Sequence, residues 1–331
     1  MENVKAIIDL GIDLSFGKVT NFSVDEANET FRRALNELAG MEDGKFDYKK
    51  FRRNQTAIFE IIEEVLDVRL EEGLKNQFER FVDYRSVAFG DKLQFRPPNR
   101  ELFRVSSIAG GTNNLRRQRI GEMQPFQIET GWEGVKFYDE LERFLAGRVD
   151  WNDLVNRVER SFTNKIQETI YTAIKGAYSG VTAPFSHTGA WDLEEFNLIV
   201  EHVRAATGLE PMVIGTRIAV SKAVPNSNYI SDSMKDSRNQ NGFFETVDGI
   251  QFGIIPQAHK VGTYDFIIDN DFLLILPNGN EKMIKFVMEG GTLIKEVTDQ
   301  QNADDSQEYV VRRKYGAAAV SGDIYGVYIL Q

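Results

Sequence analysis

Histidine is the side chain best suited to acid–base or metal chemistry near neutral pH, and this chain of 331 residues has three of them, His187, His202 and His259. They lie far apart in sequence, and none has a second metal ligand at helical spacing. Cysteine is absent, which excludes thiolate nucleophiles, thiolate metal sites and disulfides. The sequence therefore predicts no catalytic residue, no metal site and no cofactor.

The glycine-containing segments carry no phosphate-binding or nucleophile motif. Residues 40–45 (GMEDGK) have the wrong spacing for a phosphate loop and no following serine or threonine. The chain also lacks a Gly-x-Ser-x-Gly elbow and a Gly-x-Gly-x-x-Gly turn after a strand. An enzyme, centred on His187 with Asp192 or on His259, is accordingly the last-ranked interpretation.

The strongest signal is a basic segment at 85–121, where eight basic residues stand against two acidic ones. Alternating stretches at 92–95 and 101–105, two prolines at 97–98 and a Gly110-Gly111 tip predict a projecting two-stranded hairpin. Its arginines are the candidate contact residues: Arg96, Arg100, Arg104, Arg116, Arg117 and Arg119.

A hairpin of this length buries little of itself and is marginal in water, so we expect it to lie on a partner. The whole chain carries a formal charge of −11, which leaves −17 for the residues outside this segment. An acidic copy of the same chain is therefore the expected partner.

The composition is that of a soluble globular protein, with 42% hydrophobic and 27% charged residues. No stretch reaches the roughly 18 apolar residues of a membrane span, and the first residues do not form a secretion signal. We therefore expect a soluble, untargeted protein that contacts no membrane. The acidic balance argues against wrapping nucleic acid as its main role, because duplex binding depends on neutralising phosphates with lysine and arginine.

Helices are predicted before and after the basic segment. Ser23 and Glu26 have the spacing of a capping box for a helix ending near Gly40. A second helix is expected from about 47 to 70, with a break at Gly73. The clearest helix runs from 151 to 177 and is about 40 Å long, with apolar residues at steps of three and four. Another helix is predicted over 192–207, ended by Gly208.

The carboxyl-terminal part of the chain predicts strands. Candidates lie at 250–255 and 271–276, and longer alternating strands follow from 283 onward. A hairpin turn is expected at Gly290-Gly291, with further strands at about 307–320 and at the end of the chain. The predicted fold class is therefore α+β.

The order of these parts resembles the major capsid proteins of tailed bacteriophages, whose coat-protein fold is shared with encapsulin shells. The resemblance implies a helical amino-terminal arm at 1–84 and an extended loop at 85–130. It implies a peripheral domain at 131–183 and 283–315, with the spine helix at 151–177. An axial α/β domain is implied at 184–282 and 316–331.

The resemblance further implies a structural subunit, not an enzyme, that assembles into hexamers and pentamers of an icosahedral virus capsid enclosing double-stranded DNA. It implies that the arginines of the basic segment lie over the spine region of an adjacent subunit. The candidate acceptors there are Asp139, Glu140, Glu142, Asp153 and Glu159. Assembly in the host cytoplasm, with portal and possibly decoration proteins, is the corresponding expectation. The short segment before the loop suggests a separate scaffold and no cleaved leader. Two alternatives stay open at this point: an encapsulin-like nanocompartment shell, and a DNA-binding protein that uses the basic loop.

Overall fold

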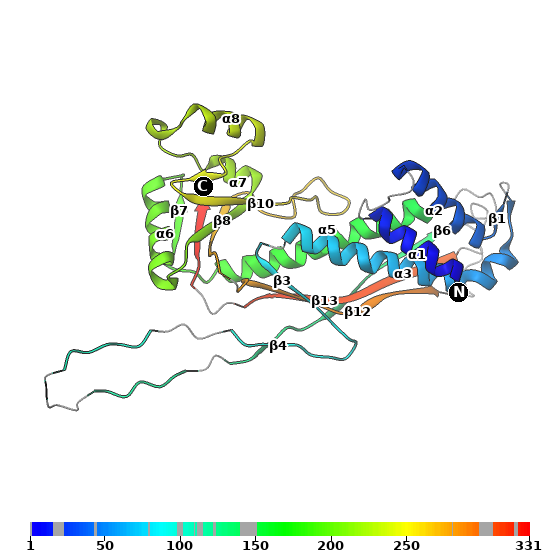
Figure 1. The fold of residues 1–331 in the computed structure, drawn as a ribbon, viewed down its shortest axis with the longest axis horizontal. Coiled ribbons are helices and arrows are strands. Elements are labelled where there is room, and N and C mark those ends of the chain that lie inside the picture. The colour runs from blue at the N-terminus through cyan, green and yellow to red at the C-terminus, as the bar shows by residue number, and fades with distance from the viewer. Residues whose placement is uncertain are drawn as a thin grey trace.

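The computed structural model describes most of the chain. The described residues are 2–15, 23–42, 45–78, 80–97, 102–108, 110, 115–121, 124–139, 151–279, 281–297, 307–320 and 324–331. The described part is elongated, with a helical end, a sheet domain at the other end, and a thin loop that projects from below (Figure 1).

Four helices pack together over one face of a long sheet (Figure 1). They are α1 (Glu2–Ser15), α2 (Val24–Leu38), α3 (Tyr48–Phe78) and α5 (Trp151–Tyr178). The predicted capping box is confirmed: the Ser23 hydroxyl accepts from the Glu26 N–H, and the Glu26 carboxylate accepts from the Ser23 N–H. The long helix predicted for 151–177 is also present.

The predicted break at Gly73 is wrong, because α3 continues without interruption to Phe78. A glycine inside a helix costs about 1 kcal/mol relative to alanine. On either side of it Leu70, Leu74 and Phe78 remain on one buried face. Their burial is worth roughly 1.5–3 kcal/mol each and outweighs the cost of the glycine.

The long sheet has the strand order β3-β12-β13-β6. Its strands are β3 (Val82–Val87), β12 (Ile284–Val297), β13 (Gln307–Ala319) and β6 (Gly131–Asp139). β12 runs parallel to β3 and antiparallel to β13, and β13 runs antiparallel to β6. Alternate residues of β12 face opposite sides: Phe286 and Met288 join the core under the helices, whereas Val287 faces a small apolar cluster on the other side.

The predicted hairpin turn at Gly290-Gly291 is wrong, since β12 continues through these glycines with a register shift between Glu289 and Leu293. Helix α3 supplies acceptors to the backbone at this bulge. Asp67 accepts from the Thr292 N–H at 2.9 Å, and Glu63 accepts from the Ile294 N–H at 2.5 Å. The glycines thus mark a bulge inside one strand, and β12 forms its hairpin with β13 instead.

A second, six-stranded sheet lies at the other end of the molecule in the order β7-β14-β11-β8-β10-β9. Its strands are β7 (Ser186–Gly189), β8 (Pro211–Thr216), β9 (Thr246–Val247), β10 (Ile250–Ile255), β11 (Phe272–Pro277) and β14 (Gly326–Leu330). The strands predicted at 250–255, at 271–276 and at the end of the chain are therefore present.

The segments that connect the strands of this sheet contain the helices α6 (Leu193–Thr207), α7 (Arg217–Lys222), the 3₁₀ helix η1 (Ser227–Tyr229) and α8 (Asp232–Asn241). The boundaries of α6 agree with the sequence, since Asp192 caps its first turn and Gly208 ends it in the left-handed conformation, with φ of 69°. The apolar face of α6 packs on the sheet through Phe196, Ile199 and Val203. The described structure is therefore α+β, as predicted.

Candidate assembly surface

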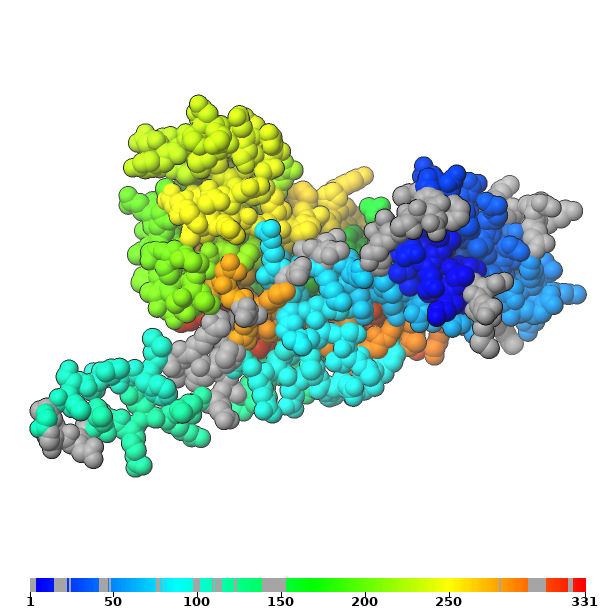
Figure 2. Space-filling view, in the orientation of Figure 1, coloured from blue at the N-terminus to red at the C-terminus, as the bar shows by residue number. Residues whose placement is uncertain are grey.

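The segment between β3 and β6 forms a thin arm that stands clear of the body (Figures 1 and 2). Near its root, β4 (Gln94–Phe95) pairs antiparallel with β5 (Phe126–Gln127). Farther out, the side chain of Gln118 bridges the two legs, accepting from the Arg104 N–H and donating to the Arg104 carbonyl at 2.8 Å each. The arm is therefore the projecting hairpin that the sequence predicts, although its ladder is short.

Beyond β4 and β5 the described legs, 102–108 and 115–121, have no regular strand pairing and are exposed along their whole length. Leu102 is 91% exposed and Val105 is 94% exposed. Several further large apolar side chains lie bare on the same legs: Phe103, Ile108, Leu115 and Ile120. Large exposed apolar side chains on legs without a strand ladder mark a candidate surface for binding another chain.

The predicted arginines lie on this arm. Arg96, Arg104, Arg116, Arg117 and Arg119 are exposed, and within the described residues none of the five forms an ion pair with a carboxylate of its own chain. Arg100 lies outside the described residues. The arm thus presents positive charge that its own body leaves unneutralised.

The predicted acceptors are only partly placed. Asp153 and Glu159 lie on α5, where Asp153 pairs with Arg157 at 2.8 Å and Glu159 pairs with Arg69 at 3.2 Å. Asp139 ends β6, and its side chain is not described. Glu140 and Glu142 lie outside the described residues. Both carboxylates on α5 therefore already have a cation within their own chain.

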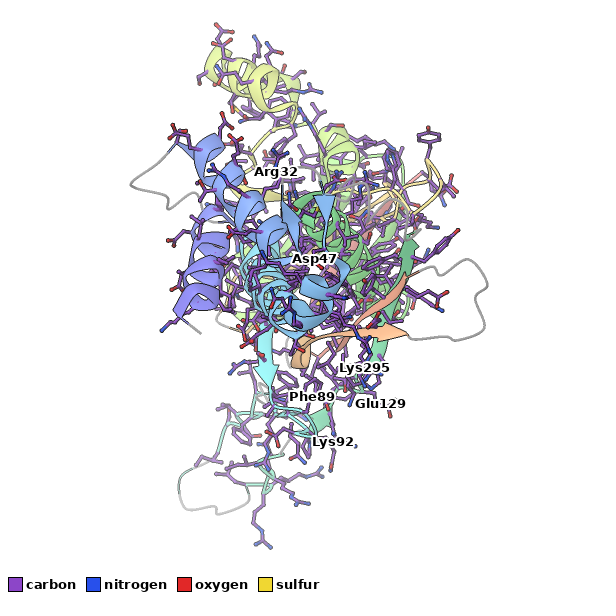
Figure 3. All side chains as sticks on the ribbon, turned by 90° about the vertical axis from the view of Figure 1, so that its right-hand side faces the viewer. Arg32, Asp47, Phe89, Lys92, Glu129 and Lys295 are labelled. Carbon is purple, nitrogen blue, oxygen red and sulfur yellow. The ribbon has the colours of Figure 1, made fainter. Side chains whose placement is uncertain are left out.

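The root of the arm is fixed to the long sheet by one carboxylate, Glu289, which is 4% exposed. It accepts from the Gly90 N–H at 2.9 Å, from the Thr130 hydroxyl, and from the Lys314 ammonium at 2.7 Å. Gly90 and Thr130 belong to opposite legs of the arm. Figure 3 labels Phe89, Lys92 and Glu129 in the region where the arm leaves the body.

The pKa of Glu289 is lowered to about 2 by its bonds to Lys314, Thr130 and Gly90. A carboxylate with a lowered folded-state pKa stabilises the fold fully above its unfolded value, near 4.5, and loses this contribution as the pH falls toward 2. We expect Glu289→Gln to lower the melting temperature most at pH 6, with the difference from wild type shrinking steadily between pH 4.5 and pH 3. Melting curves at four pH values check this, and a difference that grows in acid would contradict it.

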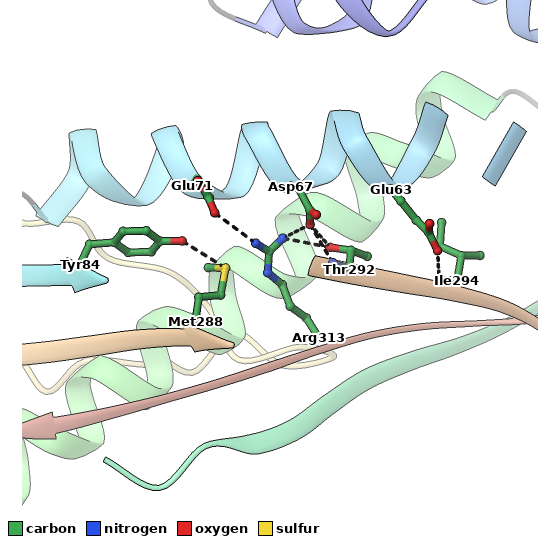
Figure 4. A network of polar contacts seen from close by, with 8 residues as sticks. All are labelled: Glu63, Asp67, Glu71, Tyr84, Met288, Thr292, Ile294 and Arg313. Atoms are coloured by element: carbon green, nitrogen blue, oxygen red, sulfur yellow. Dashed lines mark hydrogen bonds and ion pairs between the residues drawn. The ribbon is translucent and has the colours of Figure 1, made fainter. Parts of the chain in front are cut away.

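On the opposite face of the sheet, a second polar group joins α3 to β12 and β13 (Figure 4). Arg313, only 1% exposed, binds the Asp67 carboxylate and donates to the Thr292 hydroxyl at 2.9 Å. Glu71 lies 3.8 Å from its other terminal nitrogen. Burial raises the pKa of nearby Glu63. This cluster fixes the helical layer to β12 and β13, which lie between β3 and β6, the two strands that lead into the arm.

The histidines do not form a site. The His187 Nδ1 atom lies 3.5 Å from the Glu195 carboxylate, and the His187 ring is tilted against the Tyr328 ring at a centroid distance of 5.0 Å, while Asp192 caps α6. His259 stacks on Phe266 and His202 contacts Phe185. Among the described residues no group of histidine or carboxylate side chains is arranged to hold a metal ion. No described helix is long and apolar enough to cross a membrane.

The prediction from sequence missed Glu289, Arg313 and the apolar side chains of the arm. A signal existed for Glu289 and Arg313, since each is a charge inside an otherwise buried strand pattern, and such a charge requires a partner. The partners are remote in sequence, with Gly90 separated from Glu289 by 199 residues and Asp67 separated from Arg313 by 246.

Comparison with solved structures identifies the class of fold. A subunit of the capsid of a native GTA particle is 10% identical, with 77% of this chain and 89% of that chain covered at a TM-score of 0.53. The mature capsid of bacteriophage PhiM1 is 13% identical, covering 77% and 86% at 0.48. A virus-like particle from Pyrococcus furiosus is 12% identical, covering 82% and 99% at 0.47. The fold is a phage-type coat-protein fold.

The family follows from the sequence match. The family model described as "SPbeta prophage-derived putative capsid protein YonB" matches residues 14–328, which is nearly the whole chain. The chain belongs to this capsid protein family, and it is a structural subunit of a capsid shell. No curated protein matches it.

Proposed function

We propose that this subunit assembles into hexamers and pentamers of an icosahedral bacteriophage capsid that encloses double-stranded DNA, with each arm lying on the neighbouring subunit. The observation that carries this proposal is the exposed arm, whose described apolar side chains and arginines lie away from the described part of their own body. In a ring of identical subunits every arm has a neighbouring subunit to bind, because the same head-to-tail contact repeats until the ring closes.

The apolar side chains supply most of the docking free energy in this proposal. Fully burying one large apolar side chain is worth roughly 1.5–3 kcal/mol. An exposed ion pair contributes about 0.2–1 kcal/mol. The arginines therefore favour and orient an acidic partner, whereas the apolar residues of the legs supply most of the binding free energy. The overall acidic charge suits a container, because a wall that bound DNA tightly would oppose its packaging and release.

The division into functional parts belongs to the same proposal. We assign 1–84 to the amino-terminal arm, 85–130 to the extended loop, 131–183 with 283–315 to the peripheral domain, and 184–282 with 316–331 to the axial domain. The subunit performs no catalysis, assembles in the host cytoplasm, and works with a scaffold, a portal and decoration proteins.

Photo-crosslinking tests where the arm lies. Benzoylphenylalanine is placed at Phe103 in a sample that mixes ¹⁴N-labelled and ¹⁵N-labelled chains. Illumination of the assembled sample is expected to give crosslinks between light and heavy chains, with the arm joined to the acidic region around Asp153. The same sample diluted until it is monomeric is the control and should give none. Crosslinks confined to single chains would contradict the proposal.

Two further measurements distinguish the alternatives. A DNA-binding protein would bind duplex DNA as an unassembled subunit, with an affinity that falls steeply with salt. We expect only weak binding from the subunit, because its acidic body opposes it. An encapsulin-like shell would purify with an enclosed protein, whereas particles that protect DNA from nuclease favour the capsid.

A further inference from the structure

One side chain that joins both legs of the arm to the sheet lies on the face opposite the helices. Glu289 follows Val287 by two residues on β12 and so shares its face. Its carboxylate accepts hydrogen bonds from three separate segments: the first leg at Gly90, the second leg at Thr130, and strand β13 at Lys314. Charge-assisted bonds of this kind are roughly twice as strong as neutral ones. A buried carboxylate without them would be costly.

Aromatic stacking reinforces the same junction. Phe89 stacks on Trp132 with ring centroids 5.8 Å apart, and the Arg312 guanidinium lies 5.0 Å from the Trp132 ring. The Phe89 ring lies over Gly290, whose φ is +68°. A Cβ atom at Gly290 would lie 2.3 Å from that ring, so only glycine permits this approach. Both legs are thus held immediately above the bulge of β12.

Apolar contacts continue the junction toward the arm. Phe95, Ile128 and Val287 form a small buried cluster, with Phe95 and Ile128 coming from opposite legs. Lys285 lies 5.9 Å from the centre of the Phe95 ring. These contacts fix the legs relative to the long sheet, whereas the apolar side chains farther out on the legs remain exposed.

We propose that Glu289 is a positioning residue for assembly, which fixes the direction of the arm before a neighbouring subunit arrives. The inference rests on the proposed docking of the arm. A binding element that is already in its bound geometry loses less conformational freedom when it docks. Without the carboxylate the two legs lose the hydrogen bonds that join both of them to β12, and the arm samples a wider range of directions. The docking surface itself is unchanged, so assembly slows without being abolished.

Distance measurements on the unassembled subunit test this directly. Because the chain has no cysteine, spin labels can be attached at Ser107→Cys on the arm and Arg160→Cys on α5. Both positions are exposed. We expect a narrow distance distribution in the parent, and a distribution at least about twice as wide with Glu289→Ala. The rate of particle formation is expected to fall about tenfold, the size of change that a loss of preorganisation can produce.

Two matched variants separate positioning from general stability. Glu308→Ala removes a cross-strand carboxylate that pairs with Lys136 on the same sheet, and it should leave the distance distribution unchanged. Glu289→Gln is expected to restore a narrow distribution, because an amide can still accept from Gly90 and donate to the Thr130 oxygen. If Glu289→Ala does not fold, Thr130→Val removes one leg from the anchor and should broaden the distribution by a smaller amount.

The outcomes are distinct from a failure of the proposed function. An unchanged distance distribution with Glu289→Ala overturns the positioning role, even if particles form. A widened distribution with an unchanged assembly rate overturns it as well. If the parent forms no particles at any concentration, the proposed function fails, whereas the distance measurement still reports on the anchor.

Discussion

Replacing Arg116, Arg117 and Arg119 together with glutamate is expected to abolish particles at ordinary protein concentrations while leaving a folded monomer. All three side chains are exposed and, within the described residues, have no ion pair in their own chain, so the effect on folding should stay within about 0.5 kcal/mol. Each reversal converts an attraction of about 0.2–1 kcal/mol into a comparable repulsion. Three of them weaken each docking contact by roughly 1–6 kcal/mol, and every 1.4 kcal/mol is a tenfold change in affinity.

Sedimentation velocity and circular dichroism on the same samples measure assembly and folding separately. The matched control replaces the same three arginines with lysine, which keeps the charge and should keep the particles. Normal particle yield from the glutamate variant would show that the charge of the arm has no part in docking.

Replacing Arg313 with methionine is expected to lower the free energy of unfolding by about 3–5 kcal/mol, because removing one partner of a buried pair leaves the other charge uncompensated. Asp67 and Glu71 would then face the sheet without a cation, and the Thr292 hydroxyl would lose its donor. Urea unfolding measures the change through the shift of the midpoint.

Arg157→Met is the matched control, since Arg157 pairs with Asp153 at the surface and its loss should cost about 0.5 kcal/mol or less. The double variant Asp67→Asn with Arg313→Met should cost less than the sum of the two single changes, because the partners are coupled. A loss below about 1 kcal/mol for Arg313→Met would show that the cluster does not stabilise the fold.

Local sequence signals predicted the helices and strands that are specified by short-range chemistry. Capping residues Ser23 and Asp192 and the terminal Gly208 were sufficient to predict α2 and α6. Apolar residues at steps of three and four were sufficient to predict α5. Glycine was a misleading signal where tertiary contacts determine the structure. Burial of apolar side chains keeps α3 helical through Gly73. Carboxylates of α3 accept hydrogen bonds from backbone N–H groups of β12 after Gly290. Neither effect can be recognised from the ten or twenty residues that surround the glycine in sequence.

The candidate surface was predictable in location but not in its details. The excess of arginine located this candidate surface at 85–121, because the net charge of a segment can be read from the sequence alone. The exposure of Leu102 and Val105 was not predictable, since alternating apolar residues are equally typical of a buried strand face. The role of Glu289 depends on Gly90 and Thr130, which approach it only in the folded chain.

Electron microscopy of the purified protein tests the central claim most directly. We expect the chain, expressed by itself or with its scaffold and concentrated above its assembly threshold, to form closed shells of uniform diameter with fivefold and sixfold clusters on their surface. A folded subunit that remains monomeric at every concentration, with its arm folded back on its own body, would contradict the account.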